Sequence, residues 1–162
     1  MQHFELLSPF NTIWVQTFTV DSSESEYLNP MSSRPIVDGE WLQFADNYNY
    51  TVGRGGDGEA DEEDAATVPS FPVYIQSGAY STQVIGGLPL LFLGAYEART
   101  NLVNSPDGLS VGDPLSVQDF DDGGIVRRGL GLAEAGHYIV GYVVRLWASG
   151  RYADWVQFIH EG

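Results

Sequence analysis

Glycine and proline interrupt this chain so often that long helices cannot form. The 162 residues include 19 glycines and 8 prolines, and both residue types destabilise helix interiors. The segments between them are rich in β-branched and aromatic residues, which favour strands. A chain of this length can bury about two thirds of its unfolded surface. We therefore expect one all-β fold, a compact β-sandwich or small β-barrel with an extended N-terminal arm and little helix.

Turn residues between alternating segments predict several hairpins. The strongest signal joins residues 138–147 to residues 152–159, and the alternation places one set of side chains on a common face: Tyr138, Val140, Tyr142, Val144 and Leu146. Asp122-Gly123 predicts a turn between strands near Leu115 and Ile125. Asp46-Asn47 predicts a second turn, between a strand at residues 37–44 and one at residues 48–52. Only residues 132–135 resemble a helical turn.

The first 33 residues differ in character from the rest of the chain. We expect residues 1–33 to form an arm and linker and residues 34–162 to form a single β domain. Residues 12–20 are apolar on both faces, so this segment either lies inside its own sandwich or adds to the sheet of a neighbouring subunit. Residues 53–65 carry a dense acidic run and are expected to form an exposed loop.

The charge balance excludes several functions. The net charge is −15, from 22 acidic and 7 basic residues, and a chain this acidic repels phosphate backbones. The longest apolar run, residues 88–94, falls far short of the ~20 residues of a membrane-spanning helix. Residues 1–7 lack the features of a secretory signal. We expect neither nucleic-acid nor membrane binding, and a protein made and kept in the cytosol.

No residue pattern predicts catalysis or a cofactor. The acidic run at residues 57–64 lacks the ligand spacing of a calcium-binding loop. Residues 108–112 match the nucleophile-elbow pattern of hydrolases, with Asp119 and His137 following, but Pro114 disfavours the helix that this elbow needs. The chain has no cysteine, so thiolate chemistry is excluded. We predict no catalytic residue, metal or cofactor, and no enzyme activity.

Arg127 and Arg128 are neighbours on a predicted strand, so their side chains point to opposite faces. One is expected to face solvent and the other to meet a carboxylate. An internal ion pair and a contact between subunits both remain open. The four tryptophans are interpreted as core or interface residues, because aromatic side chains on strands usually are.

Six short motifs follow one another between residues 34 and 159. They are Pro35-Ile36-Val37-Asp38-Gly39-Glu40-Trp41-Leu42, Val68-Pro69-Ser70-Phe71-Pro72-Val73, Gly94-Ala95-Tyr96-Glu97-Ala98, Val111-Gly112-Asp113-Pro114-Leu115, Arg127-Arg128-Gly129 and Val140-Gly141-Tyr142-Val143. In this order they resemble the head decoration (cement) proteins of tailed bacteriophages. The resemblance implies a structural virion protein, made in the host cytoplasm, that binds the outer capsid surface. It also implies a homotrimer that stabilises the head by bridging subunits of the major capsid protein.

Under this interpretation the apolar side chains of the arm are expected to contact the capsid or a neighbouring copy. The predicted partner-binding residues are Phe4, Leu6, Leu7, Phe10, Ile13, Trp14 and Phe18, together with Arg127 and Arg128. The alternatives are a carbohydrate-binding or adhesin-like virion module and a tail-tube or head-completion protein. An acidic DNA mimic is disfavoured, because many of the carboxylates crowd into one loop.

Overall fold

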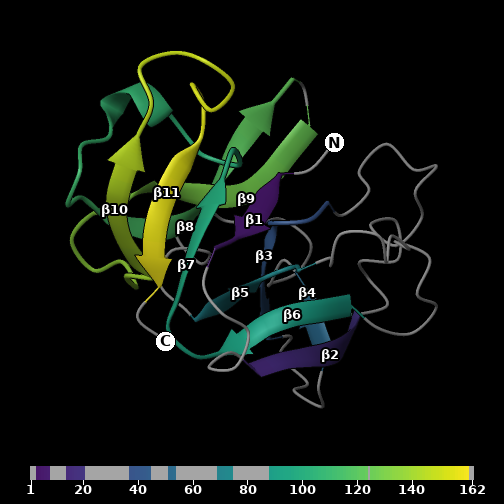
Figure 1. The fold of residues 1–162 in the computed structure, drawn as a ribbon. Helices are drawn as coiled ribbons and strands as arrows, with labels where there is room; N and C mark the ends of the chain where they lie inside the picture. Colours follow the sequence, from purple (N-terminus) through teal and green to yellow (C-terminus); the bar gives the residue numbers. More distant parts are fainter. Residues whose placement is uncertain are drawn as a thin grey trace.

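The computed structural model describes residues 3–7, 14–20, 37–44, 51–53, 69–74, 88–123 and 125–160. Within these residues the fold is all-β, which confirms the expected fold class, and the one helical element is the short 3₁₀ helix η3 (Pro106–Gly108). The strands form two sheets, one in the upper part of Figure 1 and the other in the lower part.

The first sheet has six strands, and all its neighbouring strands are antiparallel. Their order is β1 (Phe4–Leu6), β7 (Tyr96–Thr100), β11 (Val156–His160), β10 (Gly141–Leu146), β8 (Pro114–Asp122) and β9 (Ile125–Leu132). The second sheet has the order β5 (Ser70–Pro72), β3 (Trp41–Phe44), β4 (Thr51–Gly53), β2 (Trp14–Val20) and β6 (Leu88–Leu93). Here β2 and β4 are parallel and the other pairs antiparallel.

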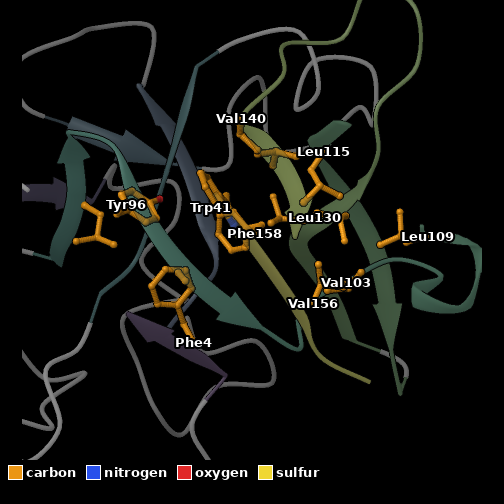
Figure 2. Close-up of a cluster of buried hydrophobic side chains, with 14 residues drawn as sticks. Phe4, Trp41, Tyr96, Val103, Leu109, Leu115, Leu130, Val140, Val156 and Phe158 are labelled. Carbon is orange, nitrogen blue, oxygen red and sulfur yellow. The ribbon is translucent and has the colours of Figure 1, made fainter. Parts of the chain in front are cut away.

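The core lies against the inner face of the six-stranded sheet. Phe158 on β11 is fully buried, and its ring centroid lies 6.2 Å from that of Trp41, which comes from β3 of the second sheet. Figure 2 shows these two rings at the centre of the cluster, with Phe4 and Tyr96 on one side and Leu115 and Leu130 on the other. Side chains of both sheets therefore share one core.

The β10–β11 hairpin is confirmed, but the prediction that the alternating side chains of this segment share one face is wrong. Val143 pairs with Phe158 and Arg145 with Gln157, so Val144 is an extra residue in a β-bulge. A bulge reverses the direction of the side chains that follow it. Val143, which precedes the bulge, is buried, and Arg145, which follows it, is exposed. Tyr138 precedes the strand and is 44% exposed, whereas Val140, from the same predicted face, is buried.

The other predicted hairpins have mixed outcomes. β8 and β9 pair across Asp122-Gly123, and Gly123 has the positive φ of 63° that the turn needs. β3 pairs with β4 as expected. Residues 132–135 form no helix, because Leu132 instead ends β9.

The N-terminal strands belong to the two sheets, so of the two placements left open for residues 12–20 the structure shows the one within the same chain. β1 pairs with β7, and the backbone amides of His3 and Phe4 donate to Asp38 Oδ2 at 2.9 and 3.0 Å. Gly39 has a φ of 84°, and a Cβ on it would lie 2.9 Å from the Phe4 Cβ. β2 pairs with β4 and β6 of its own chain. Apart from Gly53, the expected acidic loop lies outside the described residues, as do residues 21–33.

Phe4→Ala is expected to lower the free energy of unfolding by about 3 kcal/mol, the usual cost of removing a large buried side chain. Phe4 is 2% exposed and meets Tyr74, Tyr96 and Phe158 edge-on. Chemical denaturation measures the loss, and Leu7→Ala, at an exposed site, is the control. Equal effects of the two substitutions would contradict the placement of β1.

Tyr96→Phe is expected to raise the free energy of unfolding by about 1 kcal/mol. The Tyr96 hydroxyl is buried without a hydrogen-bond partner among the described atoms, and such a group costs about 1–3 kcal/mol.

Burial also raises the Tyr96 pKa well above 10.0. Above pH 10 the unfolded chain therefore loses this proton before the folded protein does, and stability falls as pH rises. Denaturation between pH 8 and 11 should show a smaller alkaline loss for Tyr96→Phe; an unchanged pH slope contradicts the assignment.

Candidate binding surface

Arg127 and Arg128 are both in the interior, so the expectation that one of them faces solvent is wrong. They are 6% and 0% exposed. Arg127 Nη1 lies 2.6 Å from Glu40 Oε1, and Arg128 Nε lies 3.1 Å from Asp119 Oδ1. Of the two interpretations left open by the sequence, the internal ion pair describes both arginines.

These two ion pairs connect different parts of the fold. Asp119 is the cross-strand neighbour of Arg128 in the β8–β9 hairpin. Glu40 immediately precedes β3, so its pair with Arg127 joins the second sheet to the edge strand β9 of the first. Asp122 also lies near Arg127, at 3.9 Å, but this carboxylate is half exposed. A buried carboxylate from a distant segment therefore holds Arg127 inside the domain.

The arm residues that were predicted to contact a partner lie in different environments. Phe4 is in the core, Leu6 packs against it, and Leu7 is 40% exposed. Trp14 and Phe18 lie on β2, while Phe10 and Ile13 lie outside the described residues. The burial of Phe4, Arg127 and Arg128 removes these three from the candidate contact residues; partner contact by the others remains a prediction.

The outer face of the six-stranded sheet carries a row of polar residues across four adjacent strands. Glu5 on β1 is opposite Arg99 on β7, Arg99 is opposite Gln157 on β11, and Gln157 is opposite Arg145 on β10. Arg99 forms an ion pair with Glu5. Because the bulge at Val144 turns Arg145 outward, two arginines lie in this row.

The loop between β10 and β11 lies at the top of Figure 1, and its aromatic side chains contact the two arginines of this row. Trp147 and Tyr152 have ring centroids 5.2 Å apart, and Trp155 meets Tyr152 edge-on at 5.4 Å. The loop turns at Gly150, whose φ is 90°. The amides of Ala153 and Trp155 donate to the carbonyls of Gly150 and Tyr152. The turn thus brings three large rings together at one end of the sheet.

Three arginines are in contact with these rings. The guanidinium carbon of Arg99 lies 4.0 Å from the Tyr152 ring centroid, that of Arg151 lies 5.3 Å from it, and that of Arg145 lies 4.8 Å from the Trp147 centroid. All are within the distance at which a cation is attracted to an aromatic face. We call these six residues the arginine–aromatic cluster: Arg99, Arg145, Trp147, Arg151, Tyr152 and Trp155.

Arg145 and Arg151 differ from the other arginines of the described part of the chain. Arg99, Arg127 and Arg128 each pair with a carboxylate, whereas Arg145 and Arg151 are exposed and pair with no described carboxylate. In a protein with 22 acidic residues, these two side chains present positive charge to solvent. The cluster is therefore the candidate binding surface.

The sequence contains a local sign of this cluster. Residues 145–155 hold two of the seven arginines and three large aromatic residues. The tryptophans at 147 and 155 were interpreted as core or interface residues, and both are only partly buried. Arg99 could not be placed with them, because its strand is some 50 residues away in the sequence and becomes a neighbour only through sheet pairing.

The hydrolase-like pattern does not form a triad. Asp119 is paired with Arg128. The Nδ1 atom of His137 lies 2.9 Å from the hydroxyl of Ser116, which is not the serine of the pattern, Ser110. Across the described ranges, no group of three or more metal-ligating side chains comes together. The same ranges contain no helix long and apolar enough to cross a membrane.

Comparisons with models of protein families, with curated proteins and with solved structures find no match for this chain.

Glu40→Gln and Arg127→Met are each expected to lower the free energy of unfolding by about 3 kcal/mol, because each removes one partner of a buried ion pair. The double variant should lose less than the sum of the two. Asp122→Asn changes the exposed carboxylate beside the same arginine and should cost less than about 0.5 kcal/mol. A double-mutant cycle by urea denaturation measures the coupling, and additive losses would contradict a direct Arg127–Glu40 interaction.

Proposed function

We propose that this protein is a structural component of a tailed-phage virion that binds the outer surface of the capsid and stabilises the head by bridging major capsid subunits. The observation that carries the proposal is the ordered set of six motifs between residues 34 and 159. The proposal also includes the homotrimeric state that the resemblance implies.

Each of the six motifs supplies buried residues to the fold. One example from each motif is Trp41, Val73, Tyr96, Leu115, Arg128 and Val143. The motifs therefore contribute to the interior of the fold. A resemblance in these motifs is accordingly a resemblance in the core. It follows that the residues that contact a partner are to be sought outside the motifs.

A decoration protein must remain intact while it connects subunits that are pushed apart by packaged DNA. The shared core and the Arg127–Glu40 pair between the sheets suit this role. Each contact with a capsid subunit buries apolar surface worth about 25 cal/mol per Å². Repetition of the contact over many sites adds avidity to a modest individual affinity.

The charge of the protein is consistent with an outer position on the virion. A net charge of −15 opposes contact with packaged DNA and favours repulsion between particles, which keeps them dispersed. The same charge requires that attachment to a capsid use a local surface of different character. The arginine–aromatic cluster is such a surface.

A carbohydrate-binding module is the main alternative, because Trp147, Tyr152 and Trp155 lie together on the surface. Their planes are inclined at 39° and 90° to one another, so they do not make a flat platform. Guanidinium groups also cover faces of Tyr152 and Trp147. These contacts leave less ring surface for stacking on a sugar, and the capsid-binding function is favoured.

The purified protein is expected to be a trimer by light scattering and to bind DNA-free heads of a phage whose genome encodes this chain. Cryo-electron microscopy of the mixture should show added density at three-fold and quasi-three-fold positions. Heads should also withstand higher temperature with the protein than without it. A monomer that does not bind heads but is retained on a glycan array would favour the carbohydrate alternative; ring-shaped assemblies would favour a tail-tube or head-completion protein.

A further inference from the structure

We propose that the arginine–aromatic cluster is the surface that docks this protein onto the capsid subunit, and that it receives a carboxylate flanked by apolar side chains. The identity of the partner as a capsid subunit rests on the proposed function. The chemistry of the contact rests on the cluster itself.

The composition of the cluster is that of a protein–protein binding centre. Trp, Tyr and Arg are the residues most enriched among those that dominate interface energies. Here the three aromatic residues are partly buried and already packed against one another, so few rotamers are lost on binding. The cluster also lies outside the six core-forming motifs, the last of which ends at Val143.

Aromatic support leaves the arginines able to bind an anion. A guanidinium group that rests its face on a ring keeps its N–H donors at the edge, where they can bind a carboxylate through two hydrogen bonds. Arg145 over Trp147 and Arg151 over Tyr152 have this support and no described carboxylate partner. The guanidinium group of Arg99, by contrast, already binds the carboxylate of Glu5.

The charge of the whole protein selects among anionic partners. A long polyanion such as nucleic acid is repelled by the net charge of −15. A protein surface with a carboxylate next to apolar groups brings little net charge and can also cover the exposed parts of Trp147 and Trp155. The fit is therefore to an acidic and apolar patch on a protein.

The test compares two double variants of equal charge. Arg145→Gln/Arg151→Gln removes two positive charges in the cluster, and Leu132→Glu/Ala135→Glu adds two negative charges on exposed residues elsewhere. Leu132 lies away from the cluster. It is opposite Leu115, and Leu115 pairs with Gly141 at the start of β10, whereas Arg145 is near the end of β10. Each double variant changes the net charge by two units, from −15 to −17.

Binding of each protein to DNA-free heads is titrated at low and physiological salt, with thermal unfolding as the check on folding. Arg145→Gln/Arg151→Gln should bind roughly 30-fold more weakly than wild type, the loss typical of a dominant interface residue. The affinity of the control variant should remain within about twofold of the wild-type affinity, because exposed charges away from the contact contribute little. The wild-type affinity should fall with added salt, and the cluster variant should show a shallower dependence.

The outcomes separate the two proposals. If wild type binds heads and both double variants bind equally well, or are weakened equally, the docking surface is wrong and the proposed function stands. If wild type does not bind heads, both proposals fail. Loss of self-association in Arg145→Gln/Arg151→Gln, with head binding unchanged, would assign the cluster to contacts between copies. Binding to glycans or nucleic acid through the cluster would equally overturn the capsid assignment.

Discussion

The packing of the two sheets depends on a buried charge interaction as well as on apolar contact. Trp41 and Phe158 supply the apolar contact at the centre, and Glu40, next to Trp41, receives Arg127 from β9. An ion pair in a protein interior contributes little net stability, but the loss of one partner is costly. We infer that the pair acts mainly on specificity, because an arrangement in which β9 and the segment before β3 are not adjacent would separate two buried charges.

The same segment determines where the N-terminal strand lies. Asp38 accepts the amides of His3 and Phe4, and Gly39 leaves the space that Phe4 occupies. Residues 38–41 thus link β1, the core and β9 within four consecutive positions. An experiment that deletes the first 20 residues would remove strands from both sheets, so a loss of partner binding could not be distinguished from a loss of folding.

Sequence reasoning succeeded where local chemistry decides the structure and failed where distant segments decide it. Asp122-Gly123 specifies its turn within two residues, and the β8–β9 hairpin was predicted. The common face predicted for residues 138–146 is wrong, because the alternation of Val140, Tyr142 and Val144 continues in the sequence through a bulge that only pairing with β11 imposes. Arg127 and Arg128 do pair with different carboxylates, but Glu40, the partner of Arg127, lies 87 residues away in the sequence. The arginine–aromatic cluster needed Arg99 from another strand.

A chain without lysine, in which acidic residues outnumber arginines about three to one, has few cations to use at a surface. Carboxylates engage the N–H donors of Arg99, Arg127 and Arg128, whereas aromatic faces support Arg145 and Arg151 and leave their donors available. The overall negative field does not prevent a contact at this site, because at physiological ionic strength charges are screened beyond about 8 Å. A partner carboxylate therefore responds to the nearby guanidinium groups more than to the net charge. In the proposed contact, local support by aromatic rings is thus the physical means by which so acidic a domain binds a carboxylate of its partner.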